Sequence, residues 1–196
     1  MRKWIIPVVI IVILAIWCAS SYNGLVAVRA DTKTAWADVE SSYQRRNDLI
    51  GNLVKTVQGA ADFERGTLTD VIEARAKATA VTVDPTNITP DQMAQFQQAQ
   101  QGVSGALSRL LVSVERYPDL KANQNFLALQ SQIEGTENRI NVARDRFNES
   151  ANVYDKKKHS FPAVIFASIF GFEDIARFKA EAGAEKAPEV EFDFKK

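Results

Sequence analysis

Residues 25–58 read LVAVRADTKTAWADVESSYQRRNDLIGNLVKTVQ, and this stretch decides the fold. Large apolar side chains recur in it at alternating steps of three and four residues, at Trp36, Val39, Tyr43, Ile50, Leu53 and Val57. Such spacing is the apolar stripe on one face of a long helix. Because no Pro occurs in residues 8–84, we expect one helix that continues to about Ala78. Gly59 and Gly66 are the points at which it can bend.

The sequence before this helix is almost wholly aliphatic: residues 4–17 read WIIPVVIIVILAIW. As a helix, Trp4 to Tyr22 would span roughly 27 Å, close to the hydrocarbon thickness of a bilayer. Trp4 at one end, with Trp17 and Tyr22 at the other, could form two aromatic belts. We therefore expect an uncleaved transmembrane anchor. The alternative is a cleavable signal peptide, although Trp17 is too bulky for lipoprotein processing at Cys18.

The orientation of this anchor follows from the charges beside it. Residues 4–28 are uncharged, and Arg2 and Lys3 precede them. These two cations favour a cytoplasmic N-terminus, with the soluble part periplasmic or otherwise extracytoplasmic. Arg29 and Lys33 follow closely on the other side and nearly cancel this bias.

Charge and composition exclude several classes of function. The chain has 24 Lys and Arg against 24 Asp and Glu, and residues 29–196 have a net charge of −2. A conventional nucleic-acid binder would need a basic face, so we expect no nucleic-acid partner. The single Cys and single His exclude a disulfide framework, a Cys/His zinc site and a Cys–His catalytic pair. We expect no enzyme activity, cofactor or metal.

Two further helices follow a loop at residues 81–90. Thr89-Pro90-Asp91-Gln92 has the residues of a capping box, with Pro at the first helical position. The second helix that begins there carries another heptad stripe, in which Gln100 is the one polar member, and it ends at Tyr117-Pro118. A third helix is expected from about Asn123 to about His159, because apolar residues recur every seven positions at Phe126, Ile133, Ile140, Phe147 and Tyr154.

These patterns predict an all-α protein. Its N-terminal transmembrane helix would be continuous with, or lead into, a long antiparallel bundle of three long helices plus a short C-terminal helix. We expect an anchor at residues 1–22, a bundle at residues 23–178 and a polar tail at residues 179–196. In that tail Val190, Phe192 and Phe194 alternate with acidic residues.

A charged residue interrupts the first stripe: Arg46 occupies a core register, where an unpaired guanidinium would be very costly. The third helix offers Glu137, Asn141, Arg144 and Asn148 along one face. We hypothesise a polar network across the bundle that comprises Arg45, Arg46, Asp48, Asn52, Glu137, Asn141, Arg144 and Asn148. The plainer alternative is that these residues specify helix register and face water. A ligand pocket and a catalytic site are further alternatives.

The last apolar segment, residues 161–172, reads FPAVIFASIFGF and is too short to span a bilayer. It could contact lipid, contact another subunit or fold back over the bundle core, and the sequence leaves these three open. The candidate membrane or interface residues are Trp4, Trp17, Tyr22, Phe161, Ile165, Phe166, Ile169, Phe170 and Phe172.

Three segments resemble a known family. Residues 22–64 contain Tyr-Asn after the anchor, a Trp, Arg-Arg-x-Asp-Leu and Asn-Leu-Val; residues 117–154 contain Tyr-Pro-x-Leu-Lys-Ala, Glu-Asn-x-Ile and Ala-Arg. With the Pro and Gly-Phe of residues 161–172, they resemble the LemA family. Gly51 and Phe147 depart from the pattern, standing where Pro and Tyr are usual. The resemblance implies a bacterial, single-span membrane protein with a bundle of long helices and no established enzymatic activity.

Two functions are compatible with these features. The first is a membrane-anchored helical bundle that self-assembles into a homo-oligomer and organises or remodels the bacterial membrane, with membrane lipid and itself as partners. Its anchor carries small residues at Ala15/Ala19 and Ser20/Gly24, a spacing that allows close helix packing in lipid. The alternative is an adaptor or sensor that binds another membrane protein or a periplasmic protein through a heptad face or the acidic–aromatic tail.

Overall fold

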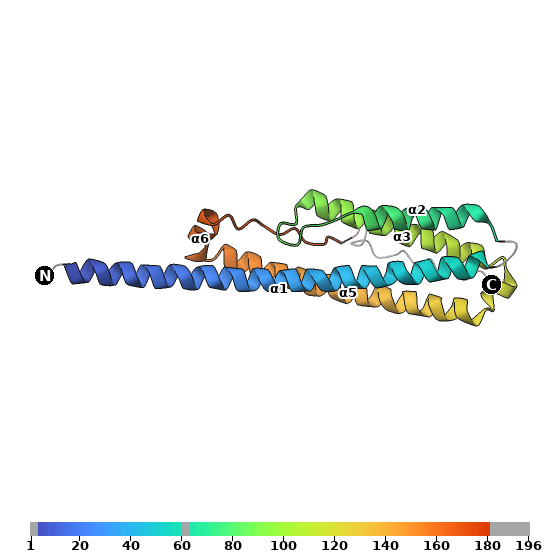
Figure 1. Cartoon of the computed structure of the whole chain (residues 1–196), viewed down its shortest axis with the longest axis horizontal. Helices are drawn as coiled ribbons and strands as arrows, with labels where there is room; N and C mark the ends of the chain where they lie inside the picture. Colours follow the sequence, from blue (N-terminus) through green and yellow to red (C-terminus); the bar gives the residue numbers. More distant parts are fainter. Residues whose placement is uncertain (1–3, 60–62, 181–196) are drawn as a thin grey trace, which may run out of the picture.

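The computed structural model describes residues 4–59 and 63–180, and every regular element in these ranges is a helix (Figure 1). The all-α prediction is therefore confirmed. The elements are α1 (Ile5–Gln58), α2 (Arg65–Ala80), α3 (Pro90–Val114), α4 (Pro118–Lys121), α5 (Gln124–Lys158) and α6 (Ala163–Ile169).

Helix α1 is 54 residues long and joins the apolar N-terminal segment to the bundle without a break. Among the described residues it is the one helix long and apolar enough to cross a membrane, and none of its most apolar window is buried. Its first part extends beyond all the other elements (Figure 1). Of the two arrangements left open by the sequence, the apolar segment is continuous with the first bundle helix.

The first bundle helix ends earlier than its apolar pattern predicts. Helix α1 stops at Gln58, with Gly59 as its C-terminal cap, and α2 begins only at Arg65. The bundle consequently has four long helices rather than three. Gly lowers helix propensity by about 1 kcal/mol relative to Ala. The apolar residues beyond the break, Leu68, Val71 and Ala78, are buried because α2 packs on α3.

The starts of α3 and α5 are fixed by their caps. The Gln92 N–H donates to Thr89 Oγ1 over 3.2 Å, and the Thr89 N–H donates to Gln92 Oε1 over 3.1 Å, which completes the predicted capping box. Asn123 Oδ1 accepts hydrogen bonds from the N–H groups of Asn125 and Phe126 at the start of α5. Both predicted helix starts are confirmed.

The long helices form two antiparallel pairs that lie face to face. One pairs α1 with α5 and the other pairs α2 with α3, while α6 packs on both α1 and α5 (Figure 1). Beyond α6, residues 170–180 form an extended segment, which we call the C-terminal strap. The Ala176 N–H donates to Ile88 O in the loop before α3 over 2.9 Å, so the strap links the two helix pairs.

The buried side chains form two clusters along the bundle. The membrane-proximal cluster includes Leu25, Trp36, Tyr43, Phe96, Phe147, Tyr154, Phe172 and Phe178. The membrane-distal cluster is mainly aliphatic and includes Leu49, Ile50, Leu53, Val57, Leu68, Val71, Val103, Leu110 and Ile133. Helix α2 contributes buried residues to the distal cluster alone; in the proximal cluster the strap and the loop before α3 take its place.

Candidate functional site

A buried arginine lies at the boundary between the two clusters. Arg46 of α1 is only 1% exposed. Its Nη1 donates to Glu137 Oε1 of α5 over 3.0 Å and to Ser104 Oγ of α3 over 3.2 Å, and its Nη2 donates to Gln100 Oε1. The guanidinium of Arg46 on α1 therefore binds both α3 and α5, and it joins the two helix pairs.

The charge of Arg46 is compensated from two directions. Glu137 supplies the opposite charge and is 38% exposed, so this carboxylate keeps part of its hydration. The Tyr43 ring lies 4.9 Å from Arg46 Cζ, which adds a cation–π contact. Burial raises the pKa of Tyr43, while Arg144 and Arg46 act in the opposite direction. Tyr43 thus remains a neutral phenol beside the cation.

Of the remaining predicted network residues, the structure brings only some to this place. Asn141 and Arg144 line a cleft of about 50 Å³ beside Arg46. Arg45, Asp48 and Asn52 are exposed on other faces of α1, away from the cleft. Glu137 is therefore the member of the predicted α5 face that pairs with Arg46.

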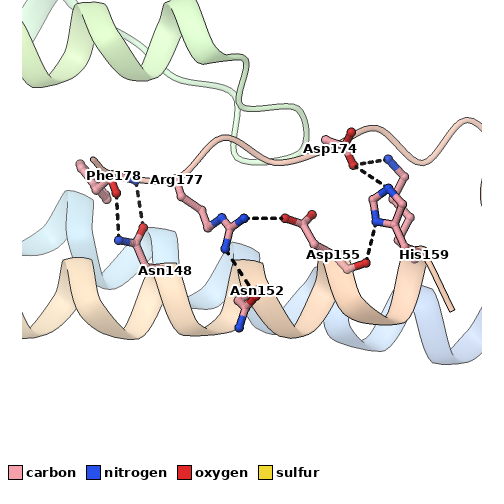
Figure 2. A network of polar contacts seen from close by, with 8 residues as sticks. Asn148, Asn152, Asp155, His159, Asp174, Arg177 and Phe178 are labelled. Atoms are coloured by element: carbon pink, nitrogen blue, oxygen red, sulfur yellow. Dashed lines mark hydrogen bonds and ion pairs between the residues drawn. The ribbon is translucent and has the colours of Figure 1, made fainter. Parts of the chain in front are cut away.

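Arg144 and Asn148 instead hold the C-terminal strap. Arg144 Cζ lies 4.7 Å from the centre of the Phe178 ring. Asn148 Nδ2 donates to Phe178 O over 3.1 Å, and its Oδ1 accepts from the Phe178 N–H over 2.9 Å (Figure 2). Phe178 is thereby fixed against Trp36, whose ring is stacked on it at 5.9 Å.

A second polar cluster lies farther along α5, at its C-terminal end (Figure 2). Lys158 Nζ contacts Asp174 Oδ1 over 2.6 Å, and Arg177 Nη2 lies 3.6 Å from Asp155 Oδ2. His159 Nε2 is 3.7 Å from Asp174 Oδ1, and its Nδ1 is 2.8 Å from Asp155 O. This cluster attaches the strap to α5.

The two carboxylates of this second cluster have opposite pKa shifts. Burial raises the pKa of Asp155, whose Oδ1 is buried without a hydrogen-bond partner in the described structure. The hydrogen bond from Lys158 lowers the pKa of Asp174. Neither acid was among the site residues expected from the sequence. Asp155 had a detectable signal, because Asp155, Lys158 and His159 are spaced to lie on one helix face. Asp174, in the strap, had no such signal.

Most of the predicted membrane or interface residues lie near the end of the apolar part of α1, whereas Trp4 is at the N-terminal cap of this helix. Trp17 meets Phe161 at a ring-centre distance of 6.1 Å, and Tyr22 meets Phe170 at 5.0 Å and Phe172 at 5.8 Å. Phe172 is buried and Phe166 is partly buried, whereas Trp4, Trp17, Tyr22, Phe161, Ile165, Ile169 and Phe170 are exposed. One side of the 161–172 segment thus covers the core, through Ala163, Ala167 and Phe172, and the other side, with Ile165 and Ile169, is exposed in the described structure.

We call Arg46 and its partners Gln100, Ser104 and Glu137 the Arg46 layer. The chemistry available there is limited. Its cleft is smaller than ordinary small-molecule pockets, which span about 300–1,000 Å³. Across residues 4–59 and 63–180, no three His, Cys, Asp or Glu side chains come together in a way that could hold a metal ion. The arrangement is suited to fixing the register of three helices.

The sequence is similar to a family profile and to several known proteins. A sequence profile of the LemA family matches residues 35–192. Magnetosome protein MamQ of Magnetospirillum gryphiswaldense is 26% identical over 174 residues, which cover 80% of this chain and 64% of that protein. Magnetosome protein MamQ 2 of Paramagnetospirillum magneticum is 24% identical over 181 residues, which cover 84% and 66%. Protein LemA of Metamycoplasma hominis is 23% identical over 158 residues, which cover 81% and 68%.

The chain thus spans slightly less than two thirds of the length of both MamQ relatives. The profile, in contrast, matches most of the chain, from the start of the heptad stripe of α1 through the strap. The matched range contains every residue of the Arg46 layer and the polar residues that attach the strap to α5. The chain belongs to the LemA family.

Proposed function

We propose that this protein is a membrane-anchored helical bundle that self-assembles and organises or remodels the bacterial membrane. The observation that carries the proposal is the single helix α1, whose apolar first part is exposed and whose second part packs on α5 in the bundle. Because no linker separates the two parts, any contact between anchors also fixes how the bundles lie. Such rigid coupling is what an ordered assembly on a membrane needs.

Two exposed surfaces support self-assembly. Along the apolar part of α1, Ala15 and Ala19 lie four residues apart and face away from the rest of the chain. Small residues at this spacing let two helices approach closely in lipid. The exposed face of the 161–172 segment, with Phe161, Ile165 and Ile169, adds an apolar surface beside the anchor.

Assembly can be tested with the full-length chain in detergent and in lipid nanodiscs. We expect oligomers in both, and Ala19→Leu should shift the mass towards the monomer because the larger side chain separates the anchors. Ile13→Leu is the matched control, since it keeps a large side chain in the same segment. A wild-type chain that is monomeric in both media, and scattered rather than arrayed when imaged on vesicles, would contradict the proposal.

We further propose that the bundle lies on the extracytoplasmic side, as Arg2 and Lys3 favour. An accessible cysteine reports this directly. In a Cys18→Ser background, Ala128→Cys places a thiol on the exposed surface of α5. A membrane-impermeant maleimide added to intact cells should label this thiol, whereas labelling only after cell lysis would place the bundle in the cytoplasm.

A non-catalytic role is part of the proposal, and the small cleft beside Arg46 supports it. The adaptor or sensor function stays as the alternative. Its expected docking segment, around Val190, Phe192 and Phe194, lies outside the described residues. Deleting residues 188–196 separates the two functions. Loss of partner capture with intact assembly would favour the adaptor, and loss of assembly would favour a contact between copies.

A further inference from the structure

A groove lies beside α1 directly after its apolar part. Its volume is about 390 Å³, and it is bounded by α1, the start of the C-terminal strap and the loop at residues 85–86. Tyr22, Phe170 and Phe172 form its aromatic end, and Arg29, Lys33 and Thr86 form its polar end. The groove was not singled out by the sequence, because its walls come from three separate segments.

The height of the groove along α1 matches the edge of a bilayer. Tyr22 is at the end of the apolar segment, and Arg29 lies seven residues later, about 10 Å along the helix. Headgroups extend roughly 5–8 Å beyond the hydrocarbon on each side of a bilayer. A long cationic side chain at this level can reach back to the phosphate layer.

The two cations of the groove are held differently. Arg29 Nη2 donates to Thr86 O, and its Cζ lies 5.5 Å from the Phe172 ring centre. Its Nε is buried with no hydrogen-bond partner in the described structure. Lys33 is exposed one turn farther along α1. No carboxylate among the described residues lies within 4.0 Å of either cation, so both charges are available to a ligand.

An acid near the groove, Asp84, is bound within its own loop. Asp84 accepts hydrogen bonds from Thr86 N–H over 2.8 Å and from Thr86 Oγ1 over 2.7 Å. These bonds, together with the charges of Arg29 and Lys33, lower the pKa of Asp84. Asp84 thus holds the 85–86 loop in place as one wall of the groove.

The aromatic end of the groove continues into the exposed apolar side chains of the 161–172 segment. Phe170 is half exposed and contacts Tyr22, and Phe161 contacts Trp17 within the apolar segment itself. An occupant of the groove must therefore be apolar on the membrane side and anionic on the side of Arg29 and Lys33. Both properties meet in a phospholipid at the surface of the bilayer.

We propose that this groove binds the headgroup of an anionic phospholipid. The phosphate lies against Arg29 and Lys33, and the upper acyl chains lie against Tyr22, Phe170 and the exposed face of α6. The inference rests on the membrane anchoring that is part of the proposed function, and it is independent of self-assembly. It gives α6 a role as a second membrane contact beside the anchor.

The test uses the full-length chain purified in detergent with an equimolar mixture of phosphatidylglycerol and phosphatidylcholine. Native mass spectrometry then measures how much of each lipid stays bound. We expect phosphatidylglycerol to be retained preferentially, and Lys33→Gln to lower its retention about five-fold, as for one cation near an anionic lipid surface. Arg29→Gln should lower it further. Lys55→Gln is the matched control, because Lys55 is an exposed lysine at the distal end of α1.

Retention that is equal in Lys33→Gln, Arg29→Gln and Lys55→Gln would overturn the proposal. Because Arg29 also supports the loop, the thermal midpoint of each variant is measured, and Lys33→Gln alone decides if Arg29→Gln unfolds. A photoreactive benzoylphenylalanine at Phe170 should crosslink to phospholipid, and the same group at exposed Leu127 should not. A protein dimer as the product at Phe170 would instead show that a second copy covers the groove.

Failure of the lipid site can be told from failure of the proposed function. A chain that is extracted from membranes by alkaline washing is not anchored, and the proposed function then fails with the site. An anchored chain without phosphatidylglycerol preference loses only the lipid site. An anchored monomer that retains phosphatidylglycerol keeps the lipid site and loses self-assembly.

Discussion

The two halves of the bundle core are built by different means. In the membrane-proximal half, Trp36 contacts the rings of Phe96, Phe147 and Phe178 at centre distances of 5.3, 5.1 and 5.9 Å. In the distal half, aliphatic side chains of α1, α2, α3 and α5 fill the core. Near the membrane, large aromatic rings and the extended strap thus complete the core, whereas α2 completes it at the far end.

This difference affects how each half depends on distant parts of the chain. The distal cluster is covered by the hairpin of α2 and α3, which are neighbours in sequence. The proximal cluster closes only when residues 172–178 return along α5. We therefore expect the strap to be the part of the structure whose attachment is most sensitive to changes in the proximal half.

The largest expected effect is that of Trp36→Ala. Truncation of a buried aromatic side chain costs about 4 kcal/mol, and a Leu53→Ala change in the distal half costs about 3 kcal/mol. Both can be measured by denaturant unfolding of the full-length chain in detergent. The distinguishing result is hydrogen exchange: Trp36→Ala should release residues 172–180, because Phe178 loses its stacking partner, whereas Leu53→Ala should leave them protected. Equal protection in both variants would refute the division of the core.

The next effect concerns the Arg46 layer, which lies between the two halves of the core. Glu137→Leu removes the charge that compensates Arg46 and should cost about 2 kcal/mol, within the range for a hydrogen bond to a charged group. The cost stays below that of a fully buried pair because Glu137 is 38% exposed.

Arg46→Met should leave a folded bundle, and combining it with Glu137→Leu should recover most of the loss. A double-mutant cycle of unfolding free energies measures the coupling. If Arg46→Met unfolds the bundle and Glu137→Leu does not rescue it, the pairing of these two residues is not what the layer contributes.

The sequence was informative where local chemistry decides the structure. Thr89 and Gln92 form the predicted capping box, and the seven-residue spacing from Phe126 to Tyr154 lies along the buried face of α5. Gln100, the one polar residue in its stripe, lies beside Arg46 because both interrupt their stripes at the same level of the bundle. Regular periodicity predicts such faces because each residue position determines its own orientation.

Features that depend on distant segments could not be read in the same way. Helix α1 ends at Gln58 while the apolar pattern continues across the break; Gly59 and Gly66 marked possible bends, but they did not show that α2 would pack on α3. The placement of Arg144 and Asn148 depends on where Phe178 returns. A polar stripe on α5 shows which residues share a face, but it does not say which of them meet another helix and which meet the strap.

The third effect separates these two roles on α5. Asn148→Ala removes two hydrogen bonds to the Phe178 backbone and should cost about 1–2 kcal/mol. The strap should lose hydrogen-exchange protection while α2 and α3 keep theirs. Asn141→Ala is the matched control, because Asn141 is an exposed asparagine two turns earlier on α5. Equal effects of the two changes would show that Asn148 does not hold the strap.

The smallest effect depends on pH and concerns the cluster that attaches the strap near the membrane. Burial raises the pKa of Asp155, so the folded state favours its neutral form. Its contribution to stability is present below the pKa of unfolded aspartate and is lost as pH rises through the folded value. Asp155→Asn keeps the shape without the charge and should raise the unfolding free energy slightly at neutral pH, by under about 1 kcal/mol, with no gain in acid.

Asp174→Asn should behave in the opposite way. The hydrogen bond from Lys158 lowers the pKa of Asp174, so its contribution is present above the unfolded pKa and is lost as pH falls through the folded value. Asp174 is 70% exposed, so solvent screens the pair and the loss at neutral pH should be small. Thermal midpoints of both variants across the acid range measure the two signs. If Asp155→Asn lowers the midpoint at neutral pH, the ion pair with Arg177 outweighs the burial of Asp155, and the strap is held there by charge.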